Sequence, residues 1–216
     1  MSRARRAWTV PEPDVPPRLE PAVLDELDDA TTAAVDLTGA VIPALSGAQV
    51  DSSDLSRLRA NAGQWERVTL ADCRIDGADL ANLVWRDGAL MRCSLREVRM
   101  TGVLLAGVRV RGTLLEGAQA SLSTWHDVQL RGVVLRGCDL SEATFVDTVM
   151  EQVLLEDCVL TSAQLSGLRC RDVQLRGCRL DGVGGVTSLR GARVAEEDAL
   201  ALLPAMAREL GITIGP

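Results

Sequence analysis

From about Val50 to Asp181, a large apolar residue recurs at every fifth position of this chain. A smaller apolar residue, such as Cys73, Ala78 or Val98, lies two positions before many of these large ones. A five-residue period fits neither an α-helix, with its period of 3.6, nor a flat strand, with its period of 2. Within each unit the two apolar residues can point inward as in a short strand, and the chain must then turn before the next unit. The pattern therefore predicts a coil that turns by a fixed amount at every unit.

The bulkiest residues indicate how many units make one turn of the coil. Every fourth unit contributes to one column, which contains Trp65, Trp85, Leu105, Trp125, Phe145 and Leu165. Four units per turn place this whole column on one face, where successive turns stack side chain above side chain. The sequence therefore predicts a four-sided coil.

Individual units resemble those of the pentapeptide-repeat family, A(D/N)LXX. The resemblance is carried by units such as Ala78-Asp79-Leu80-Ala81-Asn82, Cys138-Asp139-Leu140-Ser141-Glu142 and Ala143-Thr144-Phe145-Val146-Asp147. It implies an all-β solenoid, a right-handed quadrilateral β-helix with a dry core and a C-terminal capping helix. Four units depart from the pattern at the small-residue position and are expected to distort their sides locally: those with Gly63, Leu83, Gly88 and Leu168.

The frame divides the chain into four parts. Residues 1–17 are predicted to be a mobile proline-rich arm, and residues 18–34 an acidic segment that caps the N-terminal edge of the coil. The β-helix is predicted over residues 35–194, with slips of the frame near Pro43 and near Gly182–Gly185. Residues 195–216 are predicted to form a C-terminal helix, with a kink or two short pieces at Pro204.

The C-terminal segment has one apolar face, formed by Leu200, Leu203, Met206 and Leu210. In bacterial pentapeptide-repeat proteins, such a helix commonly caps the coil and joins two copies end to end. The resemblance therefore implies a homodimer through these residues. A cap without dimerisation is the alternative.

The sequence gives little support for catalysis, so we predict a non-enzyme with no catalytic, cofactor-binding or metal-binding residues. Five of the six cysteines occupy the small inward position and Cys170 the large one, which favours buried thiols over disulfides or a metal site. The only histidine, His126, is expected to face solvent, and the chain contains no lysine. No phosphate-binding glycine loop, signal peptide or membrane span is evident, and we predict a cytoplasmic protein.

Charge is distributed unevenly along the chain. The net charge of −7 arises as −3 in residues 1–30, −1 in residues 31–194 and −3 in residues 195–216. Residues 86–111 are rich in arginine, whereas the stretch from Cys138 to Leu168 contains acids and no arginine. These acids are the candidate partner-binding surface: Asp139, Glu142, Asp147, Glu151, Glu156 and Asp157.

Two functions remain open. Pentapeptide-repeat proteins of the quinolone-resistance type imitate DNA and bind DNA gyrase or topoisomerase IV, so the resemblance implies a topoisomerase-binding protein. A DNA rod of about 38 Å would carry about 22 charges, whereas the coil carries a net charge of −1. Mimicry of DNA would therefore have to be local, at the acids of residues 138–168. Arg131, Arg169 and Arg171 could neutralise the charge of these acids. The alternative is a scaffold for another protein partner. Direct nucleic-acid binding through the arginine block is disfavoured because the whole chain is acidic.

Overall fold

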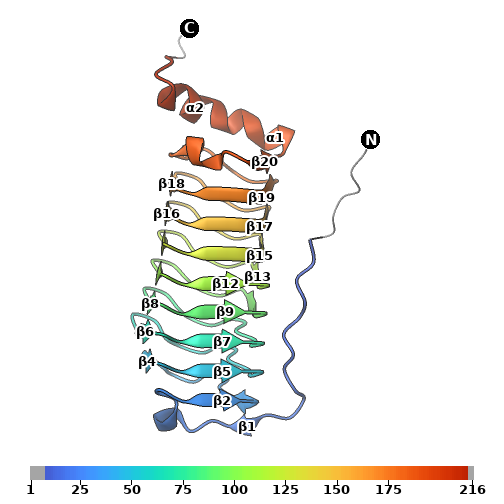
Figure 1. Cartoon of the computed structure of the whole chain (residues 1–216), viewed down its shortest axis with the longest axis vertical. Coiled ribbons are helices and arrows are strands. Elements are labelled where there is room, and N and C mark those ends of the chain that lie inside the picture. The colour runs from blue at the N-terminus through green and yellow to red at the C-terminus, as the bar shows by residue number, and fades with distance from the viewer. Residues whose placement is uncertain (1–7, 214–216) are drawn as a thin grey trace.

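The computed structural model of the chain describes residues 8–213, most of which form a straight rod (Figure 1). The start of the predicted arm and the last three positions of the predicted C-terminal segment lie outside this range. The rod is a parallel β-solenoid of about eight turns with a short C-terminal helix, which confirms the predicted fold class.

We name the four sides of the rod by their inward columns. Face A contains the column from Trp65 to Leu165, and face B that from Leu70 to Cys170. Face C contains the column from Ile75 to Leu175, and face D that from Leu80 to Leu180.

Short parallel strands form three of the faces. Face A is a seven-stranded sheet of β4 (Ala44–Ser46), β6 (Gln64–Glu66), β8 (Val84–Arg86), β11 (Leu104–Ala106), β14 (Thr124–His126), β16 (Thr144–Val146) and β18 (Gln164–Ser166). Face B contains β2 (Thr31–Ala33), β5 (Gln49–Asp51), β7 (Thr69–Ala71), β9 (Ala89–Met91) and β12 (Arg109–Arg111). Face C contains β1 (Glu20–Pro21), β3 (Val35–Asp36), β10 (Ser94–Arg96), β13 (Leu114–Glu116) and β20 (Ala192–Val194). Three long strands bend around the corner from face B to face C: β15 (Gln129–Arg136), β17 (Val149–Glu156) and β19 (Arg169–Arg176).

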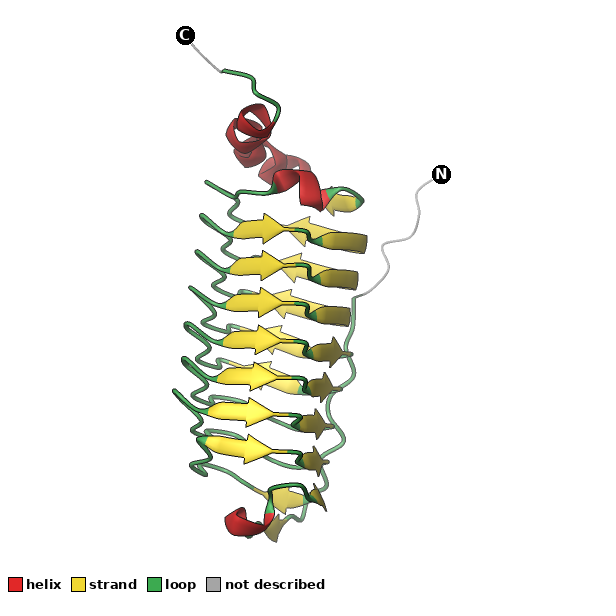
Figure 2. Cartoon of the chain, turned by 60° about the vertical axis from the view of Figure 1, so that its left-hand side comes forward, coloured by secondary structure: helices red, strands yellow, loops and turns green. Residues whose placement is uncertain are grey.

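Strand register follows the predicted interval of four units. Trp65 pairs with Trp85, Trp125 with Phe145, and Leu70 with Leu90. Face D lacks regular strands in the described chain and is held by single bridges, such as Asp79 to Arg99 and Asp139 to Val159. The strands of successive turns stack above one another (Figure 2). Because each residue stacks on its counterpart in the next turn, one apolar core runs the length of the rod.

The predicted distortions are not seen in the register. Strands β6, β8 and β9 pair without interruption around Gly63, Leu83 and Gly88. At these glycines, neighbouring atoms fill the space that a side chain would occupy, so the sides stay regular. A Cβ on Gly88, for example, would lie 2.0 Å from Nε1 of Trp85. Leu83 and Leu168 are simply buried.

Register changes only near the two ends. Val41 pairs with Arg59, whereas Ala44 pairs with Gln64, so the first turn is shorter by two positions around Pro43. At the other end, Gln174 pairs with Arg193, which shortens the last turn by one position. Both changes lie where the sequence predicted slips of the frame.

Short helices close both ends of the rod. The N-terminal end carries the 3-10 helix η1 (Leu24–Glu26), and the last turn contains η2 (Val186–Leu189). The C-terminal cap consists of α1 (Glu196–Ala199), η3 (Leu200–Leu202) and α2 (Leu203–Glu209). Pro204 lies in the first turn of α2, where its missing N–H breaks no helical hydrogen bond; the C-terminal helix is accordingly built from short pieces.

Candidate interaction surfaces

Outward side chains form columns, because equivalent positions in successive turns stack in register. The surface is therefore best described face by face. Each outward column inherits the spacing between neighbouring strands, about 4.8 Å. A charge on one turn lies within reach of the corresponding residue on the next.

Face C carries a ladder of alternating charges. Arg96 bridges Asp76 at 3.6 Å and Glu116 at 3.2 Å. Arg136 bridges Glu116 at 3.3 Å and Glu156 at 2.9 Å. The hydrogen bonds from Arg136 to Glu156 and then to Glu116 raise the pKa of Arg136. These half-exposed pairs each add little stability, but together they cancel the charge of this face.

The six candidate acids do not lie on one face. Their positions in the repeat place Asp139 on face D, Glu142 on the corner between D and A, and Asp147 on the corner between A and B. Glu151 lies on face B, Glu156 on face C, and Asp157 on the corner between C and D. A block that is continuous in sequence is thus spread around the rod.

Two of these acids have arginine neighbours. Glu151 lies 3.8 Å from Arg131 and 3.9 Å from Arg171, and Glu156 belongs to the face C ladder. The other four, Asp139, Glu142, Asp147 and Asp157, form no ion pair within residues 8–213. Asp139 accepts hydrogen bonds from the backbone N–H and the hydroxyl of Ser141 at 3.0 and 2.6 Å.

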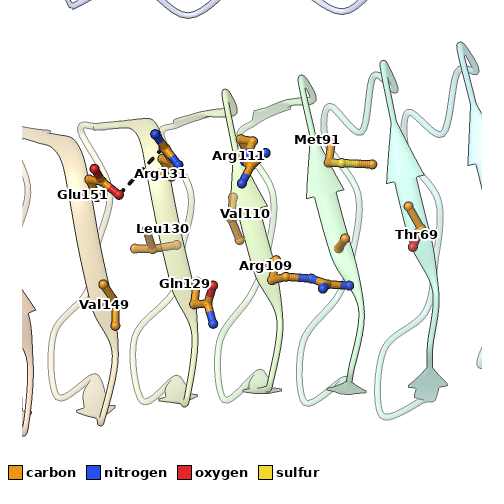
Figure 3. A pocket seen from close by; sticks show the side chains of 11 residues that line it. Thr69, Met91, Arg109, Val110, Arg111, Gln129, Leu130, Arg131, Val149 and Glu151 are labelled. Carbon is orange, nitrogen blue, oxygen red and sulfur yellow. Dashed lines mark ion pairs between the residues drawn. The ribbon is translucent and has the colours of Figure 1, made fainter.

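The arginine block of residues 86–111 is dispersed in the same way. Arg92 pairs with Asp72 and Arg99 with Asp79, whereas Arg109 and Arg111 lie on face B. There, with Arg131, they line a groove of about 340 Å³ (Figure 3), to whose lining Thr69 and Ala89 also contribute.

Face A differs from the other faces because its C-terminal half carries no charged residue at its outward positions. On β11, β14, β16 and β18 these positions are Leu104, Ala106, Thr124, His126, Thr144, Val146, Gln164 and Ser166. His126 is exposed, as predicted. Glu142 borders this area on one side, and Asp127 and Asp147 border it on the other. This surface is not among those predicted from the sequence, although the outward positions of every fourth unit already contain its uncharged pattern.

The four residues predicted for the dimer interface face solvent. Leu200 is 70% exposed, Leu203 51%, Met206 44% and Leu210 67%. The opposite side of the cap, with Leu202 and Ala205, packs against the core. Beside Met206 and Leu210, a groove of about 330 Å³ lies between the cap and the last turn.

Two carboxylates attach the cap to the open edge of the coil. Asp198 accepts a hydrogen bond from the backbone N–H of Cys178 at 2.9 Å and is itself buried. Glu209 accepts from the N–H groups of Val186 at 2.8 Å and Thr187 at 3.0 Å. These contacts satisfy donors that would otherwise be offered to another chain.

Replacing Glu209 with glutamine should loosen the cap at pH 7, and the effect should disappear as pH falls through the folded pKa of Glu209. Desolvation raises the pKa of Glu209, but the backbone hydrogen bonds from Thr187 and Val186 outweigh it and lower this pKa overall. A depressed pKa adds stability above the unfolded value, about 4.3, and that stability is lost as pH falls through the folded pKa. Hydrogen exchange at the amides of Val186 and Thr187 measures the effect. Glu197→Gln, an exposed change in α1, is the control; equal effects of both variants at pH 7 would contradict the prediction.

The buried thiols contact one another between turns: Cys73 contacts Cys93, and Cys158 contacts Cys138 and Cys178. All six cysteines are free thiols, and desolvation raises the pKa of Cys170 to about 11, so the thiol stays protonated and unreactive. Among residues 8–213, no group of histidine, cysteine and acidic side chains could hold a metal ion. No helix in the same range is long and apolar enough to cross a bilayer.

Comparison with known proteins identifies the repeat. A family model described as "Pentapeptide repeats (8 copies)" matches residues 126–161 and 145–182. A search of proteins of curated function finds no match to the chain.

Several solved structures are similar to the chain. One is HetL, a pentapeptide repeat protein involved in heterocyst differentiation regulation from the cyanobacterium Nostoc sp. strain PCC 7120, with 18% identity and a TM-score of 0.46 over 78% of this chain and 84% of HetL. Another is QnrB1, a plasmid-mediated fluoroquinolone resistance protein, with 17% identity and a TM-score of 0.33 over 88% of this chain and 91% of QnrB1. A pentapeptide repeat protein of the Arabidopsis thaliana thylakoid lumen shows 16% identity and a TM-score of 0.27 over 60% of this chain and 74% of its own.

Proposed function

We propose that this chain, whose residues 126–182 match a family model of pentapeptide repeats, is a non-enzymatic rod that binds another protein. The observation that supports this most directly is the uncharged half of face A. The central parts of protein interfaces are depleted of charged residues, and a stacked sheet offers a flat, rigid surface that needs no ordering on binding. Leu122, 58% exposed at the corner between faces D and A, adds an apolar contact beside it.

A topoisomerase is the specific partner that the resemblance suggests. Local DNA mimicry would rest on the unpaired acids that border face A rather than on all six candidates. Glu142 and Asp147 border face A on opposite sides, so they could contact basic residues of a partner seated on it. Glu151 and Glu156 contribute less to this hypothesis, because arginines already neutralise them.

The test is supercoiling by DNA gyrase at increasing concentrations of the purified protein, with and without a fluoroquinolone. We expect the native protein to inhibit the enzyme or protect it from the drug. The double variant Glu142→Arg, Asp147→Arg should lose this effect. A matched control is Glu97→Arg, Asp157→Arg, since these residues are also exposed corner acids with positive φ but lie on the corner between faces C and D, which does not border face A.

The possible outcomes distinguish a wrong partner from a wrong binding surface. Equal loss in both double variants would show a general charge effect and reject face A as the contact. No effect of the native protein at large excess would reject gyrase as the partner but not the interaction rod. In that case, a photo-crosslinker at Thr144 on face A should give adducts that one at Gln129 on face B does not; identical patterns would reject the face A proposal.

The exposed apolar side of the cap supports a second part of the proposal, a homodimer. A cluster of exposed leucine and methionine side chains is costly in an isolated monomer, and burying it against a second copy would remove it from water. We expect the native chain to sediment as a dimer and Leu203→Glu to sediment as a monomer with an unchanged far-UV spectrum. Val41→Glu, at the exposed N-terminal end, is the control and should remain a dimer. If the native chain is a monomer at micromolar concentration, the homodimer is rejected and the helix only caps the coil.

A further inference from the structure

The segment from Trp8 to Leu19, which we call the arm, runs lengthwise beside face C instead of joining the coil (Figures 1 and 2). It continues into β1, which pairs with β3 at the N-terminal end of the rod. Its described part reaches the level of β15 and β17 at the other end (Figures 1 and 2). Glu12 forms an ion pair with Arg96 at 2.6 Å, a contact between residues far apart in the sequence, and Pro13 is buried. The arm is therefore docked on the rod at several points.

Face C offers the arm an apolar strip. Leu114, Val134 and Leu154 stack in one outward column on β13, β15 and β17. Val134 and Leu154 are each only 2% exposed, whereas Leu114 is half-buried. Aliphatic residues at the equivalent outward position of uncovered faces, such as Leu104 on face A and Val149 on face B, are only half-buried. Small outward residues such as Ala89 on face B are also nearly buried, at 4% exposed, because their neighbours cover them. A large outward side chain such as Leu154 needs a further cover, and the arm is the segment that lies along this face.

We propose that this Leu114–Val134–Leu154 strip is a masked interaction surface that binds an extended protein segment carrying an aromatic residue and prolines. The arm, with Trp8, Pro11 and Pro13, is its occupant in the resting molecule. Prolines preset an extended chain, so such a segment loses little conformational entropy when it docks. This surface is separate from face A and does not depend on the partner proposed for that face.

The arm is held weakly enough to be displaced. Its ion pair is solvent-accessible on both sides, with side-chain exposures of 34% for Arg96 and 69% for Glu12, and such pairs contribute little. Nε1 of Trp8 is buried without a hydrogen-bond partner, which makes the docked indole less favourable than its apolar area suggests. A partner with a similar segment, but with an acceptor for the indole, would bind the strip better than the arm does.

The first experiment measures whether the arm covers the strip. In the full chain, Val134→Cys should react with a thiol reagent at least about tenfold more slowly than Val149→Cys, the equivalent position on face B. The native protein gives the background, since five cysteines are buried and Cys170 is half-buried. A released-arm variant, Trp8→Ala with Glu12→Arg, should make both introduced thiols react at similar rates. Equal rates in the native background, or protection that survives arm release, would overturn the proposal.

The second experiment tests the surface itself. A fluorescent peptide of residues 8–19 should bind the full-length released-arm variant at micromolar concentrations and should not bind the native chain. Adding Val134→Asp to the released-arm variant should abolish binding without unfolding it, because residue 134 points outward. Binding to both proteins or to neither, or equal binding of a scrambled peptide, would refute a masked surface. Protection of Val134→Cys that rises with protein concentration would identify the arm of a second copy as the occupant and overturn the intramolecular assignment.

Discussion

Replacing Phe145 with alanine should lower the free energy of unfolding by about 3–5 kcal/mol. Phe145 is 1% exposed and stacks on Trp125, with ring centroids 5.6 Å apart and an interplanar angle of 23°. The variant loses the buried area of the ring, leaves a cavity, and loses about 0.5–1.5 kcal/mol of ring contact. In a solenoid each turn contacts only its neighbours, so a gap in one turn also weakens the coupling between the two halves of the rod.

Equilibrium unfolding in urea, followed by far-UV circular dichroism, measures this loss. Phe145→Leu is the matched control, because Leu105 and Leu165 already occupy the same column in other turns. We expect its loss to be clearly smaller than that of alanine. A loss below about 1 kcal/mol for Phe145→Ala would mean that the neighbouring turns collapse into the gap, contrary to a rigidly registered core.

The sequence predicts the fold well because one periodicity specifies both local structure and packing. The regular spacing of Trp65, Trp85, Trp125 and Phe145 already contains the strand register. The register changes at Pro43 and near Gly185 could be predicted from the same periodicity. A turn that is shorter by one or two residues shifts the apolar residues on its far side out of the five-residue frame.

The surfaces were harder to predict because residues that are close in the sequence lie on different faces of a four-sided coil. Each repeat unit carries the chain to the next face, so Glu151 and Glu156 lie on different faces and meet arginines of the neighbouring turns. A count of charges along the sequence cannot register these pairs. Reading each face as columns recovers them, together with the uncharged half of face A.

The path of the arm could not be predicted, because a proline-rich segment without a period has no register with the coil. The contact between Glu12 and Arg96 joins residues that no repeat relates. The sequence indicates the docking of the arm only through the residues of face C. Leu114, Val134 and Leu154 occupy the same outward position in three successive turns, and an outward apolar column implies a cover.

Replacing Gly88 with alanine should cost about 1–3 kcal/mol through overpacking. A Cβ at this position would lie 2.0 Å from Nε1 of Trp85 and 2.6 Å from the carbonyl oxygen of Val68. Neither atom can move freely, because the indole is held in the stacked column against Trp65 and the carbonyl accepts the strand hydrogen bond of Ala89. Thermal or urea unfolding measures the loss.

Gly184→Ala is the control for the intrinsic effect of the added methyl group. Its Cβ would lie 2.2 Å from Oε1 of Gln164, the flexible end of an exposed side chain that can rotate away, so it should cost much less. A double-mutant cycle then identifies the cause: in a Trp85→Leu background, the added cost of Gly88→Ala should fall well below its cost in the native background. If Gly88→Ala lowers the stability equally in both backgrounds, the clash is with the backbone around Val68 and not with the indole of Trp85. The tryptophan would then not be the reason for a glycine at position 88.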